Sequence, residues 1–238
     1  MTSDQAQLKK EAGEYAVRFV KSGMVVGLGH GTTAIHALRR LAALIDEGRL
    51  TDILGVPCSL QVAKDARSLG ISLTTLNDHP VIDVTIDGAD EVDPRCDVIK
   101  GGGGALLREK IVAQATRREI IVVDPSKLSE RLGAQWAVPV EVAPFGWQTQ
   151  IGFLESVGAH VTVRYTESGN LLKTDQGNLI LDCDFGPMED PSAVAETLAS
   201  RAGIVEHGLF LDLVDDVIVA EPDGIRHMRA GHRRDGRV

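Results

Sequence analysis

The stretch Met24-Val25-Val26-Gly27-Leu28-Gly29-His30-Gly31-Thr32-Thr33 joins a short apolar run to a glycine-rich turn. Apolar residues then recur at helical spacing from Ile35 to Ile45. We therefore expect a buried strand, a tight turn and a helix, in this order. Such a unit is typical of α/β proteins, in which parallel strands alternate with helices.

The same alternation extends along the chain on both sides of this unit. A helical pattern from Leu8 to Val20 precedes it. The segments that follow it are expected to be a strand at Ile53–Val56, a helix at Leu60–Leu69, strands at Ile71–Leu76 and Val81–Ile86, a helix at Leu106–Thr116 and a strand at Ile120–Val123. This order predicts an open, mostly parallel sheet with helices on both faces.

The pattern changes after about Gly133. The expected elements there are a strand at Val138–Val142, a helix at Trp147–Val157, a strand at Val161–Tyr165, two β runs around the turn Asp175–Asn178 and a helix at Pro191–Arg201. Val217–Ala220 is expected to be a strand that returns to the first sheet. We therefore predict an α/β domain of residues 1–132 and 211–238, and a smaller α+β (ferredoxin-like) domain of residues 133–210.

The overall charge restricts the partners of the protein. The 238 residues carry a formal net charge of -9, which argues against broad binding to nucleic acid because that binding depends on Lys and Arg. One basic cluster stands at the end of the chain, and we interpret it as a solvated tail: Arg226, Arg229, Arg233, Arg234 and Arg237. A small anionic ligand remains compatible with this composition, since a local pocket can differ in charge from the whole molecule.

The sequence favours a cytoplasmic protein with reduced thiols. Cys58, Cys96 and Cys183 are far apart and odd in number, so neither a disulfide framework nor a CxxC metal site is indicated. No apolar run approaches the roughly 20 residues that a membrane helix needs. The first residues also lack the basic-then-apolar layout of a signal peptide.

The loop Gly27–Thr33 has the composition of a phosphate site. Backbone N–H groups at the start of a helix favour an anion, and the hydroxyls of Thr32 and Thr33 can donate hydrogen bonds and cap the helix. A tight strand-to-helix turn without a ligand explains the same residues, and both interpretations remain open. A dinucleotide is disfavoured, because Thr32 stands where GxGxxG requires its third glycine.

A cluster of acids, Asp87-Gly88-Ala89-Asp90-Glu91, follows an apolar strand directly. Its carboxylates should emerge at the carboxyl edge of the sheet, where open α/β folds bind ligands. Three interpretations stay open at this point: contact with sugar hydroxyls, a Mg²⁺ site built on Asp87 and Asp90, and an acidic turn without a ligand.

A second glycine loop, Lys100-Gly101-Gly102-Gly103-Gly104, precedes the helix that carries Glu109. Four successive glycines are costly in backbone entropy, by roughly 0.5–1 kcal/mol each in regular structure. They favour a loop whose N–H groups surround a ligand oxygen over a flexible linker. A carboxylate base, a cation and N–H donors together suit proton abstraction next to a carbonyl, in which one glutamate moves the proton and the donors hold an enediolate.

These motifs, in this order and spacing, resemble type A ribose-5-phosphate isomerase. The segments that carry the resemblance are Gly27–Thr33, Asp87–Glu91, Lys100–Gly103, Arg108–Lys110, Asp124–Lys127, Val138–Val142, Gly177–Asn178 and Val205–Phe210. They extend over nearly the whole chain, and their combination is more specific than any one loop.

The resemblance implies interconversion of ribose 5-phosphate and ribulose 5-phosphate through a cis-enediolate, in the non-oxidative branch of the pentose phosphate pathway. It implies no metal and no other cofactor, a homodimer or homotetramer, and neither a membrane nor a nucleic acid as partner. Glu109 would be the base, Asp87 and Asp90 would bind hydroxyls and assist ring opening, and Lys100 would stabilise the enediolate. The implied substrate-binding residues are Lys9, His30, Gly31, Thr32, Thr33, Gly88, Ala89, Gly101, Gly102, Gly103 and Lys127.

Two segments depart from the family pattern. His30 stands where the family usually has Thr, and Pro57-Cys58-Ser59 replaces a segment richer in hydroxyls. We hypothesise that His30 donates a hydrogen bond to phosphate, while a plain turn histidine is the alternative. Both departures concern how strongly phosphate is bound and which sugar is preferred.

Two other classes of protein compete with the isomerase. One is a coenzyme A transferase-like or phosphosugar deaminase relative on a similar sheet, which a failure to isomerise ribose 5-phosphate would favour. The other is a sugar-phosphate-sensing regulator, which normally carries a DNA-binding segment. Here the first helix leads straight into the core sheet, so the sequence offers no spare helix-turn-helix.

Overall fold

A computed structural model describes residues 3–231 and divides the chain into two units. Unit 1 consists of Met1–Ala89, Arg108–Leu128 and Asp212–Val238, and unit 2 of Asp90–Leu107 and Ser129–Leu211. The expected domain boundaries differ from this division at residues 90–107, 129–132 and 211, all of which belong to unit 2. The part of the chain that the structure describes contains no helix that combines the length and apolar character needed to cross a bilayer.

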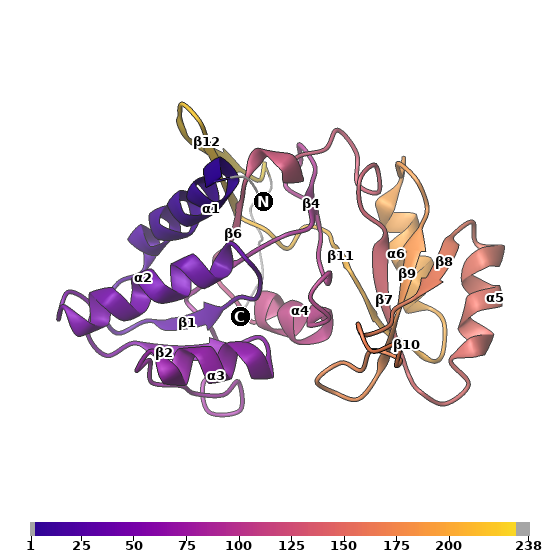
Figure 1. Cartoon of the computed structure of the whole chain (residues 1–238), viewed down its shortest axis with the longest axis horizontal. Helices are drawn as coiled ribbons and strands as arrows, with labels where there is room; N and C mark the ends of the chain where they lie inside the picture. Colours follow the sequence, from indigo (N-terminus) through magenta and orange to yellow (C-terminus); the bar gives the residue numbers. More distant parts are fainter. Residues whose placement is uncertain (1–2, 232–238) are drawn as a thin grey trace. The chain divides into compact units, whose positions relative to one another are not determined.

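Unit 1 is built on a six-stranded sheet in the order β13-β12-β6-β3-β1-β2 (Figure 1). Its strands are β1 (Val25–Leu28), β2 (Leu54–Pro57), β3 (Val84–Asp87), β6 (Glu119–Val123), β12 (Asp216–Glu221) and β13 (Gly224–Arg229). All neighbours are parallel except the pair β12 and β13. Every residue of β3 and β6 is buried, as expected for central strands that are covered on both faces.

Helices cover both faces of this sheet. They are α1 (Ser3–Ala16), α2 (Ala34–Asp46), α3 (Leu60–Ser68) and α4 (Leu106–Gln114), with short 3-10 turns η1 (Val17–Phe19) and η2 (Pro125–Lys127). The chain moves outward from β1 to β2 through α2 and back across β1 to β3 through α3. Because such crossovers are right-handed, these two helices lie on opposite faces. Apolar residues from α1, α2, α3 and the sheet form one core.

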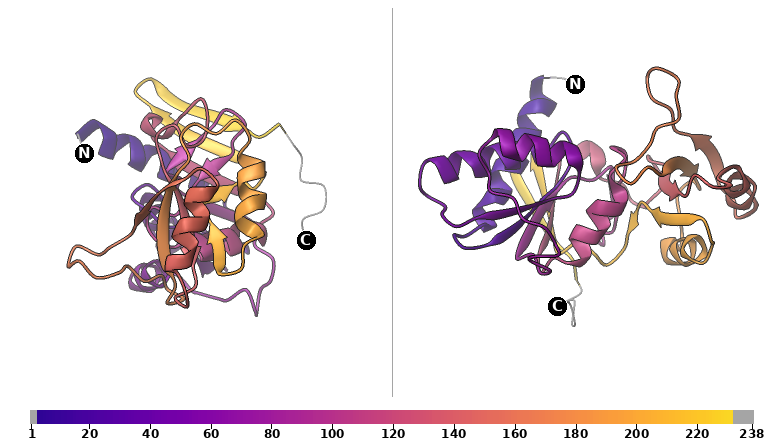
Figure 2. Two further views of the ribbon diagram at one scale, coloured as in Figure 1. Left: turned by 90° about the vertical axis from the view of Figure 1, so that its right-hand side faces the viewer. Right: turned by 90° about the horizontal axis from the view of Figure 1, so that it is seen from below.

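Unit 2 contains a four-stranded antiparallel sheet in the order β10-β7-β9-β8. Its elements follow the chain as β7 (Val138–Val142), α5 (Gln148–Ser156), β8 (His160–Val163), β9 (Leu179–Asp184), α6 (Pro191–Ala199) and β10 (Ile204–His207). This βαββαβ order is that of a ferredoxin-like unit. Leu154 of α5 and Leu198 of α6 both join the second core, and Figure 2 shows these helices from two further sides.

A small three-stranded sheet completes unit 2. It consists of β4 (Glu91–Val92), β5 (Val98–Ile99) and β11 (Leu209–Phe210), with β5 in the centre. The buried carboxylate of Glu91 accepts hydrogen bonds from the backbone N–H groups of Gly133, Gln135 and Trp136 at 2.9, 3.0 and 3.2 Å. Glu91 therefore fixes the turn that leads toward β7.

The α/β class with a ferredoxin-like second unit is confirmed, but three local expectations are wrong. Residues 71–76 form no strand and contribute only an isolated bridge from Leu73 to Gly55. The turn at Asp175–Asn178 is flanked by β9 on one side and only by the bridge Lys173–Leu179 on the other. Arg226 and Arg229 lie in β13 rather than in a tail, while Arg233, Arg234 and Arg237 fall outside the described residues.

Candidate active site

Asp87 lies at the carboxyl end of β3, beside the glycine loop that follows β1. The two strands are parallel neighbours, so their following segments meet at the same edge of the sheet. Asp87 is buried, and its Oδ1 accepts hydrogen bonds from the backbone N–H groups of His30 at 2.9 Å and Gly88 at 2.7 Å. These two bonds fix the orientation of the carboxylate.

Gly29 is what permits this close approach. A Cβ atom at this position would lie 2.4 Å from the Cα and from the Oδ1 of Asp87. The Gly29 N–H also donates to the carbonyl of Ile86 at 3.0 Å, which continues the pairing of the strands. Glycine is therefore required here by contact with the neighbouring strand end rather than by turn geometry.

Glu109 stands in the first turn of α4, where the positive end of the helix dipole favours a carboxylate. It is 5% exposed, and one of its carboxylate oxygens lies within 4.8 Å of an Asp87 oxygen and of the Cys58 sulfur. Cys58 follows β2 and is fully buried. Among the described residues, this is the one group of at least three His, Cys, Asp or Glu side chains whose donor atoms could hold a metal ion.

Lys9 reaches the first glycine loop from α1. It is 7% exposed, and its ammonium group donates to the Thr32 hydroxyl at 3.0 Å and lies 3.9 Å from Asp124 Oδ2. Asp124 in turn caps η2, the turn that ends in Lys127, by accepting from the Ser126 N–H at 3.0 Å. Asp124 thus contacts Lys9 through its carboxylate and accepts from the Lys127 N–H through its main-chain carbonyl at 3.1 Å.

The expected capping of α2 by threonine hydroxyls is wrong. Thr33 is the N-cap residue, but its side chain makes no capping hydrogen bond, and its backbone is helical. The Thr32 hydroxyl is instead the acceptor for Lys9. The first turn is held by main-chain bonds from Ile35 to Gly31 and from His36 to Thr33, both 3.1 Å.

In unit 2, Asp90 holds the second glycine loop. Its Oδ2 accepts from the Gly102 N–H at 2.7 Å, so in this structure a carboxylate oxygen occupies the acceptor position that we expected for a ligand oxygen. A Cβ at Gly102 would lie 2.7 Å from Asp90 Oδ1, so a side chain there would displace the Asp90 carboxylate. The loop is therefore shaped around a carboxylate.

The carbonyl side of the same loop is held by Arg164. Its guanidinium donates to the carbonyls of Gly101 at 2.8 Å and Gly102 at 3.2 Å, and it forms a bidentate pair with Asp182 in β9. Lys100, which precedes the loop, is buried, and its ammonium group lies 5.6 Å from the centre of the Phe210 ring. A cation over an aromatic face gains electrostatic stabilisation.

The predicted site residues thus fall into two sets. Unit 1 carries Lys9, His30, Gly31, Thr32, Thr33, Asp87, Gly88, Ala89, Glu109 and Lys127, and unit 2 carries Asp90, Lys100, Gly101, Gly102 and Gly103. The chain passes from one unit to the other between Ala89 and Asp90 and returns between Leu107 and Arg108. Both crossings lie inside the segment from Asp87 to Lys110.

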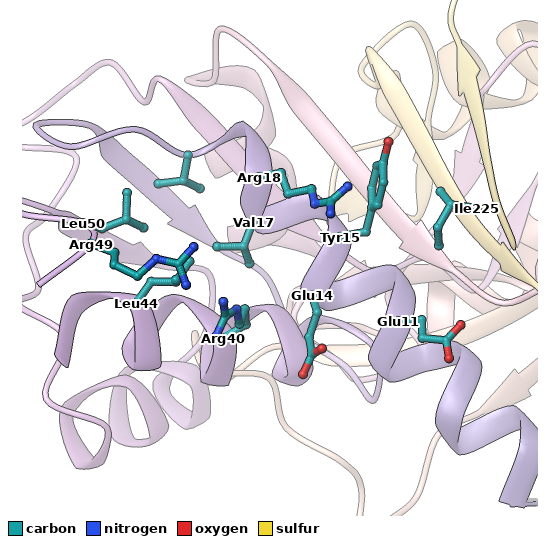
Figure 3. Close-up of a pocket in the computed structure, with 11 residues that line it drawn as sticks. Glu11, Glu14, Tyr15, Val17, Arg18, Arg40, Leu44, Arg49, Leu50 and Ile225 are labelled. Carbon is teal, nitrogen blue, oxygen red and sulfur yellow. The ribbon is translucent and has the colours of Figure 1, made fainter. Parts of the chain in front are cut away.

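Two hollows of unit 1 differ in their relation to these residues. A hollow of about 280 Å³ is lined by Val56 and Pro57, by the 74–77 segment and by Arg108, which are sequence neighbours of Cys58 and Glu109. A larger one, about 610 Å³, lies between α1, α2 and β13 (Figure 3) and includes none of the predicted site residues.

The arginines that line the larger hollow already have partners. Arg40 and Arg49 pair with Glu47 at 3.6 and 3.1 Å, and the Arg18 guanidinium lies 5.0 Å from the Tyr15 ring centre. Its charge is mixed, because Glu11 and Glu14 also line it (Figure 3).

Sequence reasoning missed three residues of these clusters. Cys58 was noted only as a departure from a family pattern, although its position after β2 indicates the same sheet edge as Asp87. Asp124 was noted only as part of a motif. Arg164 carries no local signal, because its partners Gly101 and Gly102 are more than sixty residues earlier in the chain.

Comparison with known proteins gives the family of the chain. Residues 54–224 match the family model of ribose 5-phosphate isomerase A (phosphoriboisomerase A). The chain is 58% identical over 230 residues to ribose-5-phosphate isomerase A of Desulfatibacillum aliphaticivorans, covering 97% of this chain and all of that protein.

Solved structures show the same fold. A D-ribose-5-phosphate isomerase in complex with phospho-erythronic acid superposes with a TM-score of 0.92 at 35% identity, covering 96% of this chain and 100% of that one. Ribose 5-phosphate isomerase from Plasmodium falciparum gives 0.92 at 36% identity, covering 95% and 100%. With its strand order, its buried Asp87 and Glu109 and its two glycine loops, the chain belongs to the ribose 5-phosphate isomerase A family.

Proposed function

We propose that the protein interconverts D-ribose 5-phosphate and D-ribulose 5-phosphate by proton transfer, with Glu109 as the base. One observation carries the proposal: in a member of this family, a carboxylate oxygen of the buried Glu109, at the start of a helix, lies within 4.8 Å of a carboxylate oxygen of Asp87. A second carboxylate beside the base suits a sugar, whose hydroxyls donate hydrogen bonds to it.

The reaction balances without a redox partner. In the open-chain aldose, the Glu109 carboxylate removes the proton from C2, and the electron pair moves toward the C1 carbonyl to give a cis-enediolate. A proton passes between the two oxygens, and Glu109 returns its proton to C1, which leaves a ketone at C2. Lys100 and the N–H groups of Gly101–Gly103 are assigned to the enediolate oxygens, where preorganised donors are most effective.

The remaining residues are assigned to binding. Asp87 and Asp90 take the hydroxyls and assist ring opening, with Gly88 and Ala89 beside them. The phosphate is assigned to the loop from His30 to Thr33 together with Lys9 and Lys127. The contact between Lys9 and Thr32 supports this assignment, because it brings a cation to a glycine loop at the start of a helix.

The wider context is part of the same proposal. The enzyme acts as a homodimer or homotetramer in the cytoplasm, requires no metal or other cofactor, and serves the non-oxidative pentose phosphate pathway. Its three free cysteines suit a reducing compartment.

The test is ribulose 5-phosphate formation by the purified protein in the presence of a chelator. Glu109→Gln keeps the shape of the side chain but removes the base, so we expect kcat to fall by about 10²–10⁴-fold. Glu14→Gln, in an exposed glutamate of α1, is the matched control and should leave turnover unchanged. Turnover of Glu109→Gln at the wild-type rate would overturn the mechanism, and loss of wild-type activity with chelator would revive a metal-dependent one.

A label distinguishes the chemistry independently of any variant. Product formed in deuterated water should carry solvent deuterium at C1 if a base moves the proton and exchanges it. Complete transfer of a C2 deuterium label to C1, in ordinary water and at every stage of the reaction, would instead indicate direct hydride transfer and contradict the proposal.

A further inference from the structure

Cys58, Asp87 and Glu109 bring one sulfur and two carboxylates together in the interior of unit 1. They come from three different elements: the end of β2, the end of β3 and the first turn of α4. Their donor atoms all lie within 4.8 Å of one another, and the three residues are 0%, 1% and 5% exposed. Nothing in the proposed isomerisation uses the thiol.

The three donor atoms are close enough to surround an ion after small changes of side-chain torsion angles. Zinc binds sulfur at about 2.3 Å and carboxylate oxygen at about 2.0–2.2 Å, so tetrahedral donors lie roughly 3.3–3.8 Å apart. The donor atoms therefore need to approach one another by at most about 1–1.5 Å to reach this geometry. A mixed set of sulfur and oxygen donors favours Zn²⁺ or Cd²⁺ over Mg²⁺, which takes oxygen ligands alone.

The composition of the cluster suits a cation. A divalent ion compensates two buried carboxylates and takes a thiolate sulfur as a ligand. The thiol proton is released when the ion binds.

One of the three donors is oriented by its neighbours, and the main chain of a second is fixed. Asp87 Oδ1 accepts from the N–H groups of His30 and Gly88, and the backbone N–H of Cys58 donates to the Leu28 carbonyl at 3.0 Å. Hydrogen bonds such as those to Asp87 orient metal ligands and increase their affinity.

We propose that Cys58, Asp87 and Glu109 form an inhibitory site for one thiophilic divalent cation such as Zn²⁺. The ion takes a thiolate and two carboxylates as ligands and leaves a fourth position for water. It occupies the Glu109 carboxylate and the Asp87 hydroxyl-binding oxygen, so it excludes the sugar phosphate. The binding part stands on the geometry alone, whereas the inhibition rests on the role proposed for Glu109.

Binding is tested by titrating Zn²⁺ into chelator-treated full-length protein in a calorimeter. The expected result is one strong site per chain, weakened at least about tenfold in both Cys58→Ser and Cys58→Ala. Cys183→Ala is the matched control, since Cys183 is equally buried but lies in the other unit, and it should bind like wild type. Thermal unfolding of each apo variant shows that it is folded.

A second readout identifies the sulfur ligand. Cd²⁺ should produce a thiolate-to-metal charge-transfer band in the ultraviolet with wild type and Cys183→Ala, and none with the Cys58 variants. Equal zinc affinity in wild type and the Cys58 variants, or a cadmium band that survives their substitution, would overturn the site.

Inhibition is then measured with each variant referred to its own metal-free rate. Zinc should inhibit wild type competitively against ribose 5-phosphate, chelator should restore the rate, and Cys58→Ser should require at least about tenfold more zinc. Zinc that binds as expected but leaves turnover unaffected would refute the inhibition and the role of Glu109, not the metal site. Inactivation of wild type by peroxide but not of Cys58→Ser, without zinc binding, would make Cys58 a redox site and refute the proposal.

Discussion

At the scale of single residues, the position of Asp87 is the most constrained feature of the site. Its carboxylate is oriented by two backbone donors, and its Cα is packed against a glycine that admits no side chain. The hydroxyl-binding role proposed for Asp87 depends on this fixed orientation. On that proposal Gly29 is a positioning residue, although it has no side chain of its own.

Gly29→Ala should reduce kcat by about 100-fold, because the new methyl group displaces the backbone of Asp87 and misplacement of about 1 Å costs that much. The measurement is steady-state kinetics on ribose 5-phosphate. Gly152→Ala is the control: a Cβ there meets no atom within 4 Å, and the residue lies in helix α5. It should keep full activity and gain slightly in stability. Equal activity of Gly29→Ala and Gly152→Ala would contradict the role given to Gly29.

The sequence predicted residues better than it predicted their contacts. The motifs indicated Asp87, Glu109 and Thr32 individually, because residue type and neighbouring glycines are local properties, whereas Lys9 was expected only from the family resemblance. That the Thr32 hydroxyl binds Lys9 rather than capping α2 depends on where α1 lies, which no local pattern reports. The placement of Cys58 beside Glu109 likewise follows from the order of strands.

At the scale of elements, one buried carboxylate connects three segments at the edge of the first sheet. Asp216, at the start of β12, accepts from Arg118 Nε at 2.7 Å and from His227 Nε2 of β13 at 2.6 Å. Arg118 also lies 4.3 Å from the Phe19 ring centre. Burial alone would raise the pKa of Asp216, but the bonds from Arg118 and His227 outweigh it and lower that pKa below its ordinary value.

Arg118→Met should therefore destabilise the protein by about 1–3 kcal/mol at neutral pH, since it removes the two hydrogen bonds that Nε and Nη2 donate to a buried carboxylate. Arg117→Met is the control, because the Arg117–Asp83 pair is largely exposed and should contribute less than about 1 kcal/mol. Urea unfolding measures both.

The difference in stability between wild type and Arg118→Met should depend on pH in one direction. A lowered folded-state pKa contributes stability above the unfolded-state pKa, about 3.9, and this contribution is lost as the pH falls through the folded value. The gap between wild type and Arg118→Met should thus narrow in acid. A gap that widens below pH 4 would contradict the assignment to Asp216.

Arg164 plays a comparable part for the second glycine loop. Because it holds the carbonyls of Gly101 and Gly102, it directs the N–H groups of that loop to the opposite side. Arg164→Lys loses the fork that bonds two carbonyls and Asp182 together, so we expect kcat to fall about tenfold or more with KM little changed.

Arg201→Lys is the matched control for this prediction. Arg201 is in the same unit and bonds Gln150 while lying over the Phe153 ring, so its replacement should leave kcat unchanged. A parallel decrease of kcat and of the unfolding midpoint in Arg164→Lys would indicate a purely structural role and contradict positioning of the loop.

Elements whose apolar residues recur with a clear period were predictable from the sequence. Strands that are defined only by their pairing with distant strands were not. β7 at Val138–Val142 has the expected bounds, and α2 and α6 differ from expectation at their ends alone. The two-residue strands β4, β5 and β11 are too short to show any alternation. The 71–76 segment is apolar enough for a strand, but it meets β2 at one bridge only and remains irregular.

At the scale of the whole molecule, the two units contain separate apolar cores. Leu198 of α6 is fully buried in unit 2, and Leu41 of α2 is 2% exposed in unit 1. Replacing either by alanine removes a buried side chain and should cost about 2–5 kcal/mol.

The two substitutions should act on different amides. In native-state hydrogen exchange, Leu198→Ala should accelerate exchange in β7 and β9 while β1 and β6 keep their protection, and Leu41→Ala should do the opposite. Each variant is thereby the control for the other. Uniform acceleration across both sheets in either variant would show that the cores unfold as one cooperative unit, contrary to this expectation.

The division into domains was the least accessible to sequence reasoning. A change of pattern after Gly133 marks the ferredoxin-like part, but residues 90–107 belong to the same unit while continuing the α/β pattern along the chain. Composition does not change there, and the small sheet that ties this segment to β11 pairs residues more than one hundred positions apart.

The strand order also determines at which stage of synthesis on the ribosome the six-stranded sheet can be completed. β6 is paired on one side by β3, which is synthesised before it, and on the other by β12, which follows only after the whole ferredoxin-like unit. In a nascent chain, one edge of β6 therefore stays unpaired for as long as residues 129–215 take to emerge. Every residue of this strand is buried in the folded protein. Such an edge is prone to pair with other chains, so synthesis in crowded cells should make the nascent enzyme a client of chaperones that shield strand edges.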